Sequence, residues 1–136
     1  MLEVLIVVQN AMNTLGIEYA FGEYAPISDE DEEGEESKIV YPYFVGEYTE
    51  SEPMTESGLY ESTFLLSGFS RDSWLTLEEA KERIERHFNM SSGKTYITAR
   101  GTGIAISYAG SMIVPTGDAE LKKIQINLDI KEWKVN

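Results

Sequence analysis

The sequence has no cysteine, and its first 61 residues hold only one basic side chain, Lys38. The missing cysteine excludes disulfide bonds and zinc sites with thiolate ligands. Residues 1–61 carry 15 acidic side chains, whereas residues 62–136 carry nine acidic and ten basic ones. No basic patch of the kind that binds a nucleic-acid backbone is therefore visible. The negative charge of the first half favours solubility and a partner with a positive surface.

Long hydrophobic runs are also lacking. The apolar run Val4–Val8 is short, follows Glu3 and is succeeded by polar residues. It is too short to span a membrane, and no basic segment precedes it as in a signal peptide. We therefore expect neither membrane insertion nor secretion. With 136 residues, 42% of them hydrophobic, the chain is expected to form a single domain over 1–136 with a sizeable core.

A catalytic constellation is missing as well. His87 is the only histidine, and no Cys, Ser or carboxylate motif is placed to use it, so we interpret it as a solvent-facing or boundary residue. The sequence Gly101-Thr102-Gly103 lacks the third glycine and the following helix of a dinucleotide site, which favours a simple turn. The chain is therefore expected to be no enzyme and to need no cofactor.

The acidic stretch at residues 29–36 invites a calcium interpretation. Asp29, Asp31 and Glu33 with Gly34 match the first half of an EF-hand loop. Position twelve of that loop would be Val40, where the motif needs a bidentate Glu. We therefore predict no specific metal site, and only weak attraction for Mg²⁺ or Ca²⁺.

The first half of the chain predicts one helix and three strands. Residues 2–15 carry apolar side chains at a spacing of three or four with Gly16 after them, which indicates a helix, although the β-branched Val4–Val8 leaves a strand open. Residues 17–24 predict a short strand. The stretch 28–37, with seven carboxylates, is expected to be a mobile loop.

An aromatic strand is expected from Ile39 to Val45, with Pro42 tolerated near its start or at a sheet edge. Residues 50–58 indicate a second polar loop. A further strand is expected at 59–69, forming an antiparallel pair with the aromatic strand across this wide loop.

The second half predicts an amphipathic helix over 77–90, followed by strands. Thr76 and Glu79 form a capping-box pattern at the start of this helix. The expected strands are 95–99, 104–108, 112–114 and 119–135, with turns at 101–103, 109–111 and 115–118. In the last strand apolar and polar residues alternate, which indicates one buried and one solvated face. The fold class is therefore α+β, a mainly antiparallel sheet packed by an N-terminal helix and the helix at 77–90.

This order of elements resembles the tail terminator, or tail completion, proteins of long-tailed bacteriophages. The most family-like passages are Tyr41-Pro42-Tyr43, Ile104 to Tyr108, Pro115-Thr116-Gly117-Asp118, Leu121-Lys122-Lys123-Ile124 and the final Trp133. The resemblance covers nearly the whole chain and is one of order and length more than of diagnostic motif. The acidic insertion at 29–36 departs from the usual pattern.

The resemblance implies a non-enzymatic α+β subunit that assembles as a ring, commonly of six, on the head-proximal end of the tail tube. There it would stop tube growth and join the tail to the head connector. Its partners would be other copies of itself, the tail tube protein and the connector protein. It would be assembled in the bacterial cytoplasm and end in the virion tail.

Charge suggests how such a ring would hold together. A head-to-tail ring places different surfaces of each subunit in contact, so the acidic first half can face basic residues of the second half. The expected subunit-interface residues are Arg71, Arg100, Lys122 and Lys123. The expected contacts with tube or connector lie in the two polar loops: Asp29, Asp31, Glu33, Glu35, Glu52 and Glu56.

Two other classes of protein stay open. An acidic chain without a catalytic site can act as a DNA mimic that inhibits a nucleic-acid-binding protein, although here the carboxylates are concentrated in one run. A small enzyme or ligand-binding α+β domain could use carboxylates for chemistry, but it would need a pocket with converging carboxylates that the sequence does not reveal.

Overall fold

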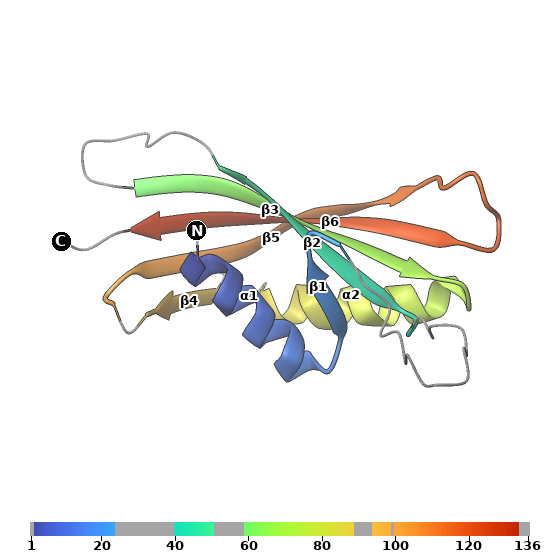
Figure 1. Cartoon of the computed structure of the whole chain (residues 1–136), viewed down its shortest axis with the longest axis horizontal. Helices are drawn as coiled ribbons and strands as arrows, with labels where there is room; N and C mark the ends of the chain where they lie inside the picture. Colours follow the sequence, from blue (N-terminus) through green and yellow to red (C-terminus); the bar gives the residue numbers. More distant parts are fainter. Residues whose placement is uncertain (1, 24–39, 51–58, 89–93, 99, 134–136) are drawn as a thin grey trace, which may run out of the picture.

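The structure, a computed structural model, describes residues 2–23, 40–50, 59–88, 94–98 and 100–133. Its elements, in chain order, are α1 (Leu2–Leu15), β1 (Glu18–Phe21), β2 (Tyr43–Glu50), β3 (Leu59–Ser70), α2 (Trp74–Phe88), β4 (Lys94–Ile97), β5 (Gly103–Val114) and β6 (Lys122–Trp133). The strands form one sheet in the order β1-β2-β3-β6-β5-β4, in which only the β1–β2 pair is parallel. Both helices lie on one face of it (Figure 1). The predicted α+β class is confirmed.

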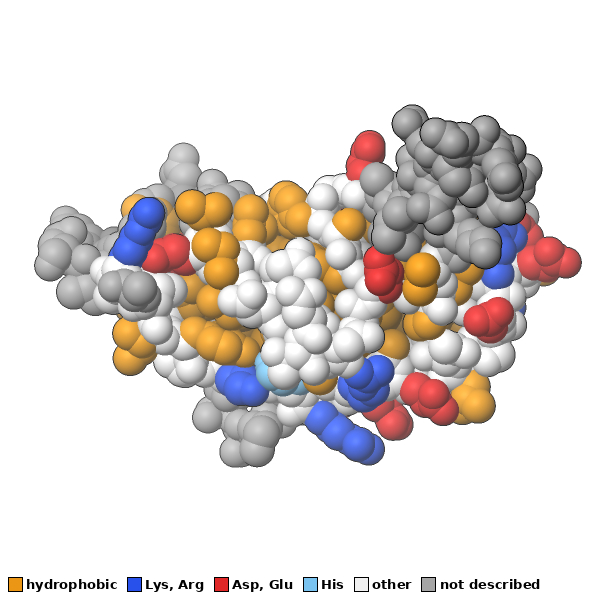
Figure 2. All heavy atoms as spheres, turned by 60° about the horizontal axis from the view of Figure 1, so that its bottom comes forward, with side chains coloured by type: hydrophobic (Ala, Val, Ile, Leu, Met, Phe, Trp, Pro, Cys, Tyr) orange, Lys and Arg blue, Asp and Glu red, His pale blue; other side chains and the backbone are white. Residues whose placement is uncertain are grey.

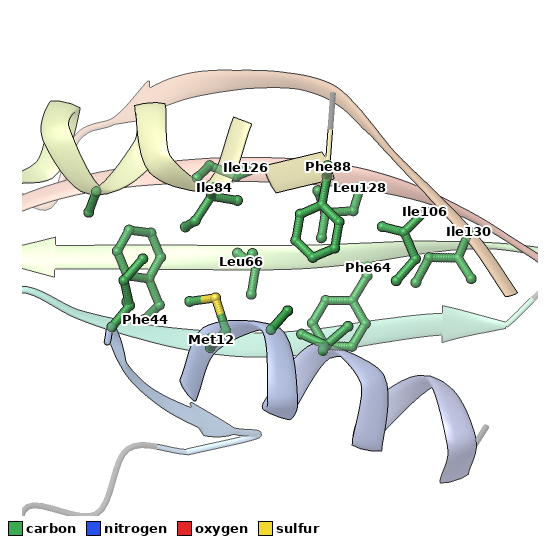
Figure 3. Packing of buried hydrophobic residues seen from close by; sticks show 14 of the residues in the cluster. Met12, Phe44, Phe64, Leu66, Ile84, Phe88, Ile106, Ile126, Leu128 and Ile130 are labelled. Atoms are coloured by element: carbon green, nitrogen blue, oxygen red, sulfur yellow. The ribbon is translucent and has the colours of Figure 1, made fainter. Parts of the chain in front are cut away.

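The core lies between the two helices and the sheet (Figure 3). In β6, every second residue from Ile124 to Ile130 is buried, as the alternating pattern predicted. The largest fully buried side chains come from both helices and four strands: Met12, Phe44, Phe64, Leu66, Leu77, Ile84, Phe88, Ile104, Ile106, Ile124, Ile126 and Leu128. All belong to a single apolar cluster, so the two helices and the sheet share one core.

The first helix resolves the alternative that the sequence left open. Val4, Val8 and Met12 are buried at helical spacing, and this burial outweighs the weak strand preference of β-branched residues. The helix ends at Gly16, whose φ of 68° suits glycine. The N–H of Gly16 donates to the Asn13 carbonyl and that of Ile17 to the Met12 carbonyl, both at 3.0 Å. This is the Schellman arrangement that closes a helix.

The start of the second helix was predicted three residues too late. The helix begins at Trp74, and Ser73 is its N-cap, since the Thr76 N–H donates to the Ser73 hydroxyl oxygen at 3.4 Å. Thr76 therefore lies inside the first turn, and the capping box of Thr76 with Glu79 was wrong. The predicted buried stripe is confirmed at Leu77, Ala80, Ile84 and Phe88. The predicted residues 89 and 90 lie outside the described part of the chain.

The turn predicted at 109–111 is wrong, because β5 continues through it. A bulge between Tyr108 and Gly110 inserts one extra residue opposite β6, and Gly110 takes up the irregular backbone with a φ of 137°. The two strands predicted at 104–108 and 112–114 are therefore one strand that stays paired with β6 on both sides of the bulge.

The aromatic strand begins later than predicted. Pairing of β2 with β3 starts at Tyr43, just after Pro42, because proline has no N–H to donate to the ladder. The strand continues to Glu50, and its antiparallel pairing with β3 is confirmed. The acidic loop at 28–37 and residues 51–58 of the second polar loop lie outside the described residues.

The other predicted turns are confirmed. At the β4–β5 turn, Gly101 has a φ of 83° and the Thr98 N–H donates to the Thr102 carbonyl at 2.9 Å. At the β5–β6 turn, the Thr116 hydroxyl donates to the Leu121 carbonyl at 2.8 Å. This last turn connects β5 to β6, and β6 pairs with both β5 and β3 from its first residues onward.

Candidate assembly surfaces

The structure describes where the four predicted subunit-interface residues lie, whereas the predicted loop contacts fall outside the described residues. The six loop carboxylates, at positions 29, 31, 33, 35, 52 and 56, lie outside the described residues. Of the basic residues, Lys123 lies opposite Phe69, Lys122 lies opposite Ser70, and Arg71 follows directly. Arg100 is far from them, in the β4–β5 turn at the other end of the sheet. Three of the four basic residues therefore lie at one end of the sheet, with Lys122 and Lys123 on opposite faces of it.

Arg71 is already engaged within its own chain. Its Nε donates to the Tyr41 hydroxyl oxygen at 3.2 Å and its Nη1 donates to Asp118 Oδ2 at 3.4 Å. The pKa of Asp118 lies below its ordinary value, because the Glu120 backbone N–H donates to its carboxylate and Arg71 adds a positive charge. These contacts tie β3 to the β5–β6 turn. Arg71 therefore has a structural role in addition to any role in an interface.

A row of aromatic rings runs beside this basic end, on the sheet face opposite the helices. Tyr43 stacks on Phe69 with ring centroids 5.1 Å apart, and the Tyr41 ring lies 5.5 Å from that of Tyr43. The Lys123 ammonium lies 5.3 Å from the Phe69 centroid, within the range of a cation–π contact. Sequence reasoning identified the aromatic strand but missed this row, because its pairing with Phe69 depends on strand register.

Exposed apolar side chains gather at both ends of the sheet. At the end that holds the β5–β6 turn, Trp74 and Ile113 line a groove of about 290 Å³, with Leu75 and Met112 also exposed nearby in the chain. At the opposite end the exposed residues are Leu2 and Ile6 on α1, Ile97 on β4 and Trp133 on β6. Figure 2, which brings the helices forward, shows apolar side chains at the surface toward this second end. Such patches are typical of surfaces that meet another protein.

A depression of about 410 Å³ on the helix-free face is lined by Glu61, Asp129 and Lys131. Glu61 lies directly opposite Lys131 in the β3–β6 pair, and Asp129 lies opposite Thr63. This is the arrangement of cross-strand partners on an open sheet, which favours a structural interpretation over a catalytic one. Within the described residues, no group of three or more His, Asp or Glu side chains could hold a metal ion.

His87 occupies a boundary position at the C-terminal part of α2, as predicted. Its Nε2 lies 3.2 Å from the Tyr96 hydroxyl oxygen, and its Nδ1 lies 3.4 Å from the Lys94 Nζ. The ring also meets the Phe88 ring edge-on, with centroids 4.8 Å apart. In Figure 2 the histidine is visible at the surface. The pKa of His87 is lowered, mainly because burial disfavours the charged ring and also because Lys94 repels it.

This lowered pKa predicts a pH dependence of stability. The unfolded chain takes up a proton at His87 at higher pH than the folded chain, so the free energy of unfolding should fall as the pH drops below about 6.5. Urea unfolding at pH 7, 6 and 5 measures the free energy of unfolding at each pH. His87→Gln should reduce its change with pH in the range above the titration of the carboxylates. If the free energy of unfolding changes with pH as steeply in His87→Gln as in the wild type, His87 is not the cause of the pH dependence.

A scan against protein-family models found no match for this chain, and a search of curated proteins found none either. Within the residues that the structure describes, no helix is long and apolar enough to cross a membrane.

Proposed function

We propose that this chain is a non-enzymatic structural subunit that caps the head-proximal end of a bacteriophage tail tube. Several copies form a ring, with six as the expected number. The ring stops tube growth and joins the tail to the head connector, so its final location is the virion tail. The proposal starts from the resemblance in the order of elements, which the fold class described above accommodates.

The observation that carries the proposal is the distribution of exposed apolar side chains. A ring subunit needs two different contact surfaces, because each copy meets one neighbour through one surface and the next through another. Exposed apolar residues lie at both ends of the sheet: Trp74, Leu75, Met112 and Ile113 at one end, and Leu2, Ile6, Ile97 and Trp133 at the other. This distribution favours an assembling subunit over a protein that acts alone.

The basic end provides the second support. Lys122 and Lys123 are consecutive at the start of β6 and point to opposite faces of the sheet. Lys122 lines the apolar groove with Trp74 and Ile113, whereas Lys123 lies over the Phe69 ring on the other face. A mixed apolar and basic surface fits the acidic character of the first half of a neighbouring copy. The DNA-mimic alternative rests on the acidic excess of residues 1–61, against which the concentration of carboxylates in one run at 29–36 counts. That run lies outside the described residues, so this alternative gains no support here.

Tube assembly tests the proposal directly. Purified chain is added to polymerising tail tube protein encoded in the same genome, and tube length is measured by electron microscopy. We expect shorter tubes with density at one end. Tubes that grow to the same length distribution with and without the chain would overturn the proposal.

The double variant Lys122→Glu, Lys123→Glu should weaken this capping at least tenfold, because it would place four carboxylates, with Asp118 and Glu120, around one end of the hairpin. A matched control is Arg86→Glu, Lys131→Glu, which makes the same change in net charge at exposed sites away from that end. The concentration of each variant that halves the mean tube length is measured and compared with that of the wild type. Equal capping by the two variants would contradict a role of Lys122 and Lys123 in the interface.

A further inference from the structure

β4 is a short edge strand with a single strand neighbour. In the described part of the chain it pairs only with β5, through the four residue pairs that run from Lys94–Ile106 to Ile97–Gly103. From Ser107 onward β5 has no outer strand neighbour among the described residues, so that edge of the sheet is open. A strand with so few pairings depends on its side-chain contacts to stay in place.

The ring of His87, near the end of α2, contacts both side chains that β4 directs toward the helices. Lys94 and Tyr96 share the helix-bearing face with their buried β5 partners, Ile106 and Ile104. The Tyr96 hydroxyl oxygen lies 3.2 Å from His87 Nε2, and the Lys94 Nζ lies 3.4 Å from Nδ1 and 3.5 Å from Nε2. An ammonium group can only donate, so its contact with the ring needs a lone pair on a neutral His87.

We propose that His87 is a pH-sensitive switch that holds β4 against α2 while its ring is neutral and favours release of the strand once the ring is protonated. A protonated ring would place a positive charge 3.4 to 3.5 Å from the Lys94 ammonium and would no longer accept a hydrogen bond from it. Release of β4 carries Lys94 away and opens the ring to water. It also bares the edge of β5 at Gly103–Ile106.

The direction of the effect follows from linkage between proton binding and release. The pKa of His87 is lowered in the folded chain because burial disfavours the charged ring and because Lys94 repels it. Lys94 and Tyr96, which contact the ring, both belong to β4, so release of the strand relieves these penalties. The released state therefore binds the proton more tightly, and release becomes easier as the pH falls below about 6.5.

The other ionisable groups around the ring do not replace Lys94 in this role. On α2, Arg83 extends toward the end of α1, and Arg86 pairs with a carboxylate one turn earlier. Burial raises the pKa of Tyr96, so its hydroxyl stays neutral at acidic pH. β5 carries no charged side chain, and the one charged residue of α1, Glu3, accepts hydrogen bonds from the β4–β5 turn. Lys94 is therefore the charge that responds to protonation of the ring.

Release of β4 is a movement within one chain and does not depend on the proposed function. Tube capping tests the proposed function, whereas amide exchange in β4 tests the switch, so the two can fail separately.

Hydrogen exchange of backbone amides, followed by NMR at pH 7 and pH 5, tests the switch. Protection factors relate each measured rate to that of an unstructured chain at the same pH, so the chemical effect of pH on exchange cancels. Amides that join β4 to β5 should be less protected than those that join β3 to β6, because β4 opens locally. Their protection should fall at least threefold from pH 7 to pH 5. One histidine with an ordinary pKa in the released state allows a fall of at most about 25-fold.

Three variants separate the switch from ordinary fraying of an edge strand. His87→Gln has no charge at either pH and should abolish the fall in protection. Lys94→Met keeps the apolar stem without the ammonium and should make the fall smaller, whereas Lys131→Met, with the same charge change at an exposed site on β6, should leave it unchanged. Circular dichroism checks that all three are folded.

Four outcomes would overturn the switch. Protection of β4 could stay constant with pH in the wild type, or fall as far in His87→Gln as in the wild type. Lys94→Met could behave like Lys131→Met. The β4 amides could also be as strongly protected as those between β3 and β6, which would mean that β4 opens only when the whole chain unfolds.

Discussion

Phe64→Ala should lower the free energy of unfolding by about 3 to 5 kcal/mol. Phe64 is fully buried on β3 and lies between the two helices and the sheet (Figure 3). Its ring centroid is 6.0 Å from that of Phe21 and 6.0 Å from that of Tyr48. Truncation removes the apolar contacts of the ring and leaves a cavity that these neighbours cannot fill completely. Chemical denaturation measures the loss, which is a large fraction of the stability of a typical domain.

Phe21→Ala is the matched control for this prediction. Phe21 has the same side chain and contacts the same cluster, but it is 45% exposed at the end of β1. Its truncation should cost less than half as much as that of Phe64, because much of its surface is already in water. Equal losses for the two variants would show that the helices do not close over Phe64 as described.

Gly68→Ala should destabilise the fold by about 1 to 3 kcal/mol, although it adds only one methyl group. A Cβ atom added at Gly68 would overlap the Phe44 ring. It would lie 2.6 Å from Phe44 Cζ and 3.0 Å from Cδ2, with Cε2 closer still. Phe44 is fully buried, so its ring has little room to move away. Glycine is needed here because the ring lies directly on the backbone of β3.

Gly103→Ala separates this effect from a general intolerance of alanine. Gly103 also lies in a strand, but the nearest atom to an added Cβ is in the Trp133 ring at 3.4 Å, an ordinary contact distance, and Trp133 is itself partly exposed. Thermal unfolding of the two variants should show a clear drop for Gly68→Ala and a change of less than about 1 kcal/mol for Gly103→Ala. Equal losses of stability in the two variants would contradict the Phe44 contact as the cause.

The sequence predicted elements best where the apolar pattern was strong, and boundaries worst where local signals competed. Two hydroxyl residues, Ser73 and Thr76, both suit the start of α2, and the sequence alone could not decide which one caps it. The glycine at position 110 suggested a turn, yet the pairing energy of β6 along both halves of β5 favours a bulge. In each case contacts between distant segments decided between two locally acceptable structures.

The candidate surfaces were less predictable than the fold. The Arg71 contact with Asp118 joins residues 47 positions apart, and the stacking of Tyr43 on Phe69 depends on the exact β2–β3 register. No local pattern contains that information. The open edge of β5 follows from the shortness of β4, a boundary that periodicity defines poorly.

The position of β6 in the sheet has a consequence for how the chain is made. On one side of β6 lie β3, β2 and β1, and on the other lie β5 and β4, so the two groups of strands are joined in the sheet only through β6. Of the described strands, β6 is the last to leave the ribosome. Until then β3 and β5 each present an unpaired side, and a nascent chain that stalls before Lys122 holds two separate half-sheets. Completion of this fold is therefore expected to be a late event of synthesis, with the growing chain most exposed to wrong pairing just before it.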